Sequence, residues 1–220
     1  MRWITLDTNT IIKFFPILIK GSITTIELTT ITIVLGTALA LLIAFTKISR
    51  NVFLNSFGSL YTWLFRGTPL LVQLFLIYYG LPQFGLRLDP FPAAVIGLTL
   101  NIAAYIAEVI RASIESIEKA QWEAAYTMGL GFWKTVFLII LPQSMKRMIP
   151  PLTNEFIALL KDTSLVSTIA MVDLMRTAQQ ISSTTFKPME ILLGAAILYL
   201  MMTSVFTIIF KVMETKFSYD

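Results

Sequence analysis

The feature that most constrains this chain is a series of long apolar stretches that are nearly free of charge. A helix needs about 20 apolar residues to cross the hydrocarbon core of a bilayer. Backbone N–H and C=O groups find no hydrogen-bond partners in hydrocarbon. A spanning stretch is therefore expected to be a helix, in which these groups bond to one another. The stretches predict an all-α polytopic membrane protein with five transmembrane helices, at about 22–46, 53–80, 93–112, 152–171 and 189–210.

Composition excludes most soluble alternatives. The chain is 56% hydrophobic and 14% charged, whereas soluble domains average roughly 45–50% apolar and about 25% charged residues. Its basic residues are scattered along the sequence, which argues against a nucleic-acid partner. Cysteine and histidine are both absent, so disulfides, thiol nucleophiles, imidazole catalysis and N/S-ligated zinc are excluded. No metal site is predicted.

The pattern predicts a short N-terminal segment followed by a single transmembrane domain, which contains one long loop. Residues 1–21 are expected to form an extracytoplasmic or interfacial segment, and 22–216 a single transmembrane domain. Within it, 113–148 is a long polar and helix-rich loop. Five spans put the termini on opposite sides, and the excess of Lys and Arg on the loop's side predicts an external N-terminus and a cytoplasmic C-terminus.

The polar loop carries the most specific motif, Glu-Ala-Ala followed by a glycine and, further on, Leu-Pro. It resembles the EAA motif of the membrane subunits of ABC importers. In that family the loop forms a coupling helix that docks on the ATP-hydrolysing subunit, and the resemblance implies this role for Glu123, Ala124, Ala125, Gly129, Gly131 and Pro142. The glycines are expected to break the helix and Pro142 to end it. An ordinary amphipathic surface helix is the alternative.

Three further segments, 66–73, 104–111 and 154–167, resemble span signatures of polar amino-acid permeases of the histidine, glutamine and arginine type. Together with the EAA motif they occur in the family's order and cover most of the chain. The resemblance implies the type I ABC importer permease fold and a place in the bacterial cytoplasmic (inner) membrane.

Polar residues inside the spans are candidates for the substrate path, because charges in a membrane usually face a cavity, a partner or the bundle interior. A zwitterionic amino acid needs groups of both signs. The predicted lining comprises Arg66, Gln73, Asn101, Tyr105, Glu108, Lys161, Asp162, Thr163 and Ser164. The alternative is that these charges pair structurally: Arg66 with Glu108 or Glu155, and Glu108 with Arg111 along one helix.

The phosphate-binding pattern G-x-x-x-x-G-K-[ST] does not occur in the sequence, so the chain is not expected to be an ATPase or to hold a cofactor. The family implies that ATP and Mg bind a partner. Expected partners are a second permease subunit, identical or similar, two ATP-binding subunits, an extracytoplasmic amino-acid-binding protein and the lipid membrane.

The sequence therefore predicts a permease subunit of an ATP-driven importer of polar amino acids, coupled through 123–131. An acidic lining would suit a basic amino acid, although glutamine or another polar solute remains open. The rival classes are a passive channel and a structural membrane scaffold, which would share the spans but not need the EAA motif. A membrane enzyme is disfavoured because no reaction centre is recognisable.

Overall fold

The computed structural model describes residues 7–218, and that part of the chain is helical almost throughout, with no strand. The all-α prediction is confirmed. The α-helices are α1 (Thr8–Ile48), α2 (Val52–Gly67), α3 (Leu70–Phe75), α4 (Pro90–Glu115), α5 (Lys119–Thr127), α6 (Phe132–Thr135), α7 (Leu141–Asp162), α8 (Leu174–Thr185) and α9 (Pro188–Ser218). Short π and 3-10 helices join them: η1 (Leu76–Gly80), η2 (Leu81–Phe84), η3 (Val136–Ile140) and η4 (Thr163–Ile169).

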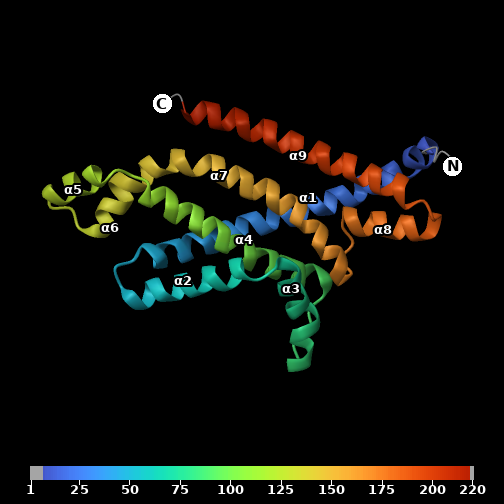
Figure 1. Ribbon diagram of the computed structural model, residues 1–220, viewed down its shortest axis with the longest axis horizontal. Helices are drawn as coiled ribbons and strands as arrows, with labels where there is room; N and C mark the ends of the chain where they lie inside the picture. Colours follow the sequence, from blue (N-terminus) through green and yellow to red (C-terminus); the bar gives the residue numbers. More distant parts are fainter. Residues whose placement is uncertain (1–6, 219–220) are drawn as a thin grey trace, which may run out of the picture.

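The long helices run broadly along one axis of the molecule (Figure 1). One end carries α5, α6 and the turn between α1 and α2, and is called the α5 end below. The opposite end carries α8 and the start of α1, and is called the α8 end. Helix α1 packs along α4 and also contacts α2, α8 and α9. It therefore connects the helices of the α5 end with those of the α8 end.

Three helices, α1, α4 and α9, are long and apolar enough to cross a membrane. The pair formed by α2 and the segment from α3 to η2 passes the same test together, but it is bent by 99°. The fourth predicted span corresponds to α7 and η4, and α7 carries Lys146, Arg147, Glu155 and Lys161 along its length. The number of five spans therefore stays a prediction.

The N-terminal segment is continuous with the first long helix, and its extracytoplasmic or interfacial position stays a prediction. From Thr8 onwards it is the first part of α1, which continues through Pro16; residues 1–6 of the expected segment lie outside the described part. A proline inside a helix removes one backbone hydrogen bond, and the tertiary contacts of α1 outweigh this local cost.

Asp7 fixes the start of α1. Its carboxylate accepts hydrogen bonds from the backbone N–H groups of Asn9 and Thr10. It also forms an ion pair of 2.6 Å with Lys187, in the turn between α8 and α9. The Lys187 ammonium lowers the pKa of Asp7 to about 2. The first and last long helices are thus joined at the α8 end.

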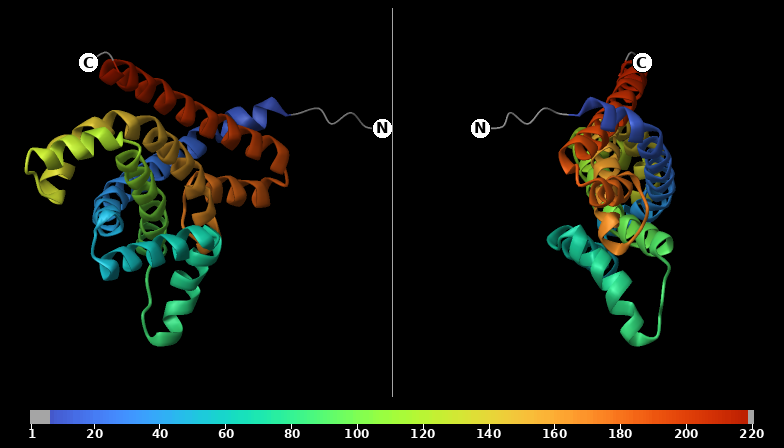
Figure 2. Two further views of the ribbon diagram at one scale, coloured as in Figure 1. Left: turned by 60° about the vertical axis from the view of Figure 1, so that its left-hand side comes forward. Right: turned by 90° about the vertical axis from the view of Figure 1, so that its right-hand side faces the viewer.

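The second apolar stretch, 53–80, is predicted as one span, and the structure breaks it in the middle. Helix α2 ends at Gly67, and Thr68 is extended, with φ −120° and ψ 143°. A proline disfavours the helical conformation of the residue before it, so Pro69 accounts for the extended Thr68. The segment from α3 to η2 then projects away from the other helices (Figure 2).

The polar loop 113–148 is rich in helix, as predicted, and Gly129 breaks it with a φ of +80°. Pro142 does not end a helix, contrary to expectation. It lies in the first turn of α7, which follows η3 without a break, so the helical run passes through the proline. The helix continues past Pro150 and Pro151, so α7 starts well before the predicted fourth span.

Close packing of α1 against α8 generates a prediction. A Cβ added at Gly21 would lie 2.9 Å from the Cα of Leu174 and 2.9 Å from the Oγ1 of Thr177. Backbone atoms cannot yield as a side chain can, so Gly21→Ala should destabilise the protein by about 1–3 kcal/mol, the usual cost of overpacking. The measurement is the melting temperature in detergent. Gly80→Ala is the control, since its Cβ would meet nothing closer than 3.9 Å; equal melting temperatures would contradict the packing.

Candidate functional site

A cavity of about 570 Å³ lies where the end of α2 meets α4 and α7. The break at Thr68 and Pro69 forms one wall. Helices α4 and α7 supply the others. The polar side chains that border it are Arg66, Thr68, Asn101, Tyr105, Glu155 and Asp162. We call this space the first cavity.

Two amides hold the broken backbone beside the first cavity. The Nε2 of Gln73 donates to the carbonyl oxygens of Phe65, at 2.9 Å, and Thr68, at 3.1 Å. The Nδ2 of Asn101 donates to the Phe65 carbonyl at 3.2 Å and to the Gln73 Oε1 at 3.0 Å. These bonds satisfy carbonyl groups that lose their helical partners at the break, which is the condition for irregular backbone inside a membrane.

The α7 wall is acidic. Glu155, Ala158 and Asp162 all border the first cavity, because residues at i, i+3 and i+7 share one helix face. Neither carboxylate forms an ion pair with the described side chains, those of residues 7–215. Lys161 points elsewhere and borders a separate cavity of about 460 Å³ beside Thr203 of α9.

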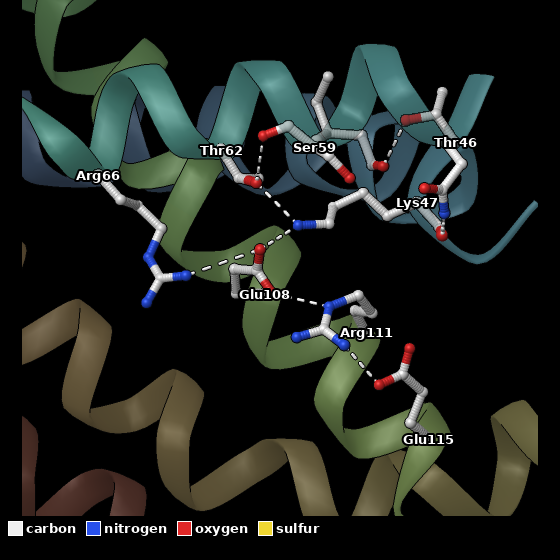
Figure 3. A network of polar contacts seen from close by, with 10 residues as sticks. Thr46, Lys47, Ser59, Thr62, Arg66, Glu108, Arg111 and Glu115 are labelled. Atoms are coloured by element: carbon white, nitrogen blue, oxygen red, sulfur yellow. Dashed lines mark hydrogen bonds and ion pairs between the residues drawn. The ribbon is translucent and has the colours of Figure 1, made fainter. Parts of the chain in front are cut away.

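Glu108 lies at the centre of a network of charges drawn from three helices (Figure 3). Its Oε1 forms an ion pair with Lys47 of α1 and lies 3.6 Å from an Nη1 of Arg66 at the end of α2. Its Oε2 accepts a hydrogen bond of 2.8 Å from Arg111. Arg111 also pairs with Glu115. The pairing of Arg66 and Arg111 with Glu108, considered from the sequence as a structural alternative, is present.

A second cavity, of about 420 Å³, continues toward the α5 end. It shares Arg66, Tyr105 and Glu155 with the first cavity and adds polar groups further along α4 and at the start of α7. These additional groups are Glu108, Ser113, Ser116 and Arg147. The guanidinium of Arg66 lies 5.4 Å from the centroid of the Tyr105 ring.

The EAA segment forms an exposed corner at the α5 end. Glu123 and Ala124 are exposed on α5, whereas Ala125 is buried against the rest of the corner. Gly129 takes the left-handed conformation that closes α5, and Gly131 precedes α6. The corner is braced by stacked rings of Trp122 and Phe132 and by a hydrogen bond of 2.9 Å from Arg50 to Tyr126.

The predicted lining residues thus separate into groups. Those that border the first cavity are Arg66, Asn101, Tyr105 and Asp162. Glu108 borders only the second cavity, and Gln73 lies behind the break. The hydroxyl of Thr163 is buried and donates to the Leu160 carbonyl, and Ser164 accepts a hydrogen bond from Ser167 through its own carbonyl.

Two residues beside the site were not among the predicted lining. From the sequence, Glu155 is considered a charge inside the membrane and a pairing partner of Arg66, and its i, i+7 spacing to Asp162 is the signal that places it in the lining. Lys47 directly follows the first predicted span, and no local pattern connects it to Glu108, 61 positions away.

An all-helical chain with membrane-length helices, charged cavities between them and an exposed helical corner at one end has the structure of a membrane transport subunit. The chain belongs to the family described as binding-protein-dependent transport system inner membrane component, which matches residues 14–219.

Curated relatives agree with this assignment. The chain is 45% identical over 205 residues to the L-cystine transport system permease protein TcyB of Bacillus subtilis, which covers 93% of this chain and 88% of that protein. It is 37% identical over 212 residues to the arginine transport system permease protein ArtQ of the same organism, covering 96% of this chain and 97% of that protein.

Solved structures agree as well. An amino acid ABC transporter crystallised with histidines superposes with a TM-score of 0.91 at 38% identity, over 97% of this chain and 100% of the other. The MetNI methionine transporter, at 17% identity and a TM-score of 0.80 over 93% and 97%, shares the fold.

The protein is therefore a permease subunit of an amino-acid ABC importer with the type I importer permease fold. In such systems the ATPase is a separate chain, so the absence of a phosphate-binding loop is expected and this chain is a transport subunit. The passive channel and the structural scaffold are not favoured.

The support of the broken backbone can be tested at Gln73. Gln73→Leu removes the amide that serves Phe65 and Thr68 while keeping the volume similar. Because it leaves buried carbonyls unsatisfied, it should destabilise the protein by about 1–3 kcal/mol. The melting temperature of the purified protein reports this. Gln143→Leu is the matched control, since Gln143 is exposed and its bonds lie on the surface; an equal loss in both variants would contradict the role of Gln73.

Proposed function

We propose that this chain forms the translocation path of an importer for polar amino acids, with basic amino acids as the best fit, and that the first cavity holds the cargo. The observation that carries the proposal is the convergence of two carboxylates, Glu155 and Asp162, with Asn101 and Tyr105 at the broken span. Transporters commonly bind substrate at such interrupted helices. Glutamine and cystine, named for relatives, are the alternative cargoes.

The charges of the first cavity support a cationic group on the cargo. Glu155 and Asp162 have no cationic partner within the described chain, and a charge left unpaired in a membrane interior is costly. An ammonium or guanidinium group of the substrate would neutralise them. The Tyr105 hydroxyl, which makes no hydrogen bond within residues 7–218, would donate to the substrate carboxylate.

The α5 end is the proposed docking site for the ATP-binding subunits. Glu123 and Ala124 are exposed there, and Gly129 and Gly131 set the corner that presents them. Basic residues are frequent at this end, including Lys119, Lys134 and Lys146, which supports a cytoplasmic position and an external N-terminus.

The proposed complex has two permease chains, two ATP-binding chains that hold ATP and Mg, and an extracytoplasmic amino-acid-binding protein. Delivery of the amino acid opens the path from outside. Closure of the ATP-binding subunits then draws the α5 helices of the two permease chains together and switches the path between its outward and inward states. Pro142, in the first turn of α7, lies where the coupling segment joins the wall of the first cavity.

The cargo site is tested by neutralising its acids. Glu155→Gln and Asp162→Asn should each raise the KM for arginine about tenfold or more, because each removes one charge-assisted bond. The KM for glutamine should change less. Uptake into proteoliposomes containing the whole complex measures both. Asp89→Asn, an exposed carboxylate outside the cavity, is the control; unchanged KM values in both cavity variants would contradict the proposal.

The coupling role is tested by Glu123→Arg. Reversing an exposed charge at a docking surface should reduce amino-acid-stimulated ATPase activity at least about tenfold, since like charges then face the partner. Insertion and melting temperature should be unaffected, because Glu123 makes no ion pair within the described chain. Glu118→Arg gives the same charge change at the start of α5 and should have a smaller effect. Wild-type amino-acid-stimulated ATPase activity of the Glu123→Arg variant would contradict the proposed coupling role of Glu123.

A further inference from the structure

Arg66 stands between the two cavities. It lies in the last turn of α2, its side chain is 45% exposed, and it borders both spaces. Tyr105 and Glu155 are the other two residues that border both cavities. Along α4, the cavities together extend from Asn101 to Ser116, about 22 Å of helix, with Tyr105 between. The three shared residues therefore form the partition between the first cavity and the second.

Glu155 is an open acceptor on this partition. It is half-buried, borders both cavities together with Tyr105, and forms no ion pair with the side chains of residues 7–215. A guanidinium is attracted to any carboxylate within reach and binds it with two parallel N–H groups where the geometry allows. Arg66 borders the same two spaces as Glu155, yet its recorded ion pair is with Glu108.

The contact with Glu108 is a loose one, which leaves Arg66 able to exchange partners. The Nη1 of Arg66 lies 3.6 Å from the Oε1 of Glu108, outside ordinary hydrogen-bond length, whereas Lys47 and Arg111 bind the same carboxylate directly. Glu108 is 15% exposed and is fixed by those two cations. Figure 3 shows Arg66 directed toward Glu108 from the end of α2.

Resting on the function proposed above, we propose that Glu108 is a positioning residue for charge selection: it holds the guanidinium of Arg66 away from Glu155 and so keeps the carboxylates of the first cavity open to a cationic group of the cargo. When Glu108 releases it, Arg66 binds Glu155 and competes with the cargo. Glu108 acts through Arg66 and does not touch the cargo itself. Lys47 and Arg111 keep Glu108 in place.

The test uses the whole reconstituted complex and arginine as the probe. Glu108→Gln weakens the hold on Arg66, so the KM for arginine uptake should rise about tenfold, the scale of one hydrogen bond to a charged group, while kcat changes less. The double variant Glu108→Gln with Arg66→Gln should restore the KM to that of Arg66→Gln alone. Glu115→Gln removes a carboxylate from the same Arg111 but leaves Arg66 in place, and it should keep the wild-type KM.

A purely structural role of Glu108 would give a different result. The two changes would then add in the double variant, and the loss would follow the melting temperature rather than KM. That outcome, or a wild-type KM in Glu108→Gln, overturns the inference. If Glu108→Gln does not fold, Glu108→Asp keeps the charge on a shorter side chain and should give a smaller rise in KM that Arg66→Gln again reverses. Failure of the wild-type complex to transport any amino acid would instead refute the proposed function.

Discussion

A proline in the middle of an apolar stretch leaves carbonyl groups of the preceding turn without donors, and hydrocarbon supplies no water to replace them. This constraint governs the centre of the molecule. Pro69 imposes the break, and the amides of Gln73 and Asn101 supply the missing donors. Helix α4, which carries Asn101, must therefore pack against the end of α2 at this level. The first cavity exists because the chain turns by 99° there.

The break also explains the position of the charges. A helix that ends inside the bundle can direct its last side chain into the space that opens beside it, and Arg66 occupies that position. Glu108 of α4 lies next to Arg66 and also forms an ion pair with Lys47 of α1. One carboxylate thus links three helices through charge pairs. Because Glu108 is only 15% exposed, its attraction to these cations is stronger than it would be at a fully exposed surface.

The fold class and the family were accessible from the sequence, because both depend on local patterns. Long uncharged stretches indicate helices, and the motif at Glu123 indicates the family. The 99° bend was not predicted, although Thr68 and Pro69 were visible, since the length of an apolar stretch says nothing about its straightness. The pairing of Lys47 with Glu108 was inaccessible because it depends on how α1 packs along α4. Part of the cavity lining could be predicted from the sequence, because helical spacing places Asn101 and Tyr105 on one face. The same spacing could not show that the carboxylate of Glu108 is paired with cationic side chains.

The exposed corner at the α5 end and the cavities are connected by two helices. Helix α4 leads directly into α5, and α6 leads through η3 into α7, so both cavity walls are continuous with the corner. Helices transmit displacement along their axes as rigid elements, whereas packed cores switch between discrete arrangements. A movement of α5 relative to α1 would therefore shift α4 and α7 together, and with them Tyr105 and Glu155. Lys47 belongs to α1 and Glu108 to α4, so the same movement acts on the pair that restrains Arg66.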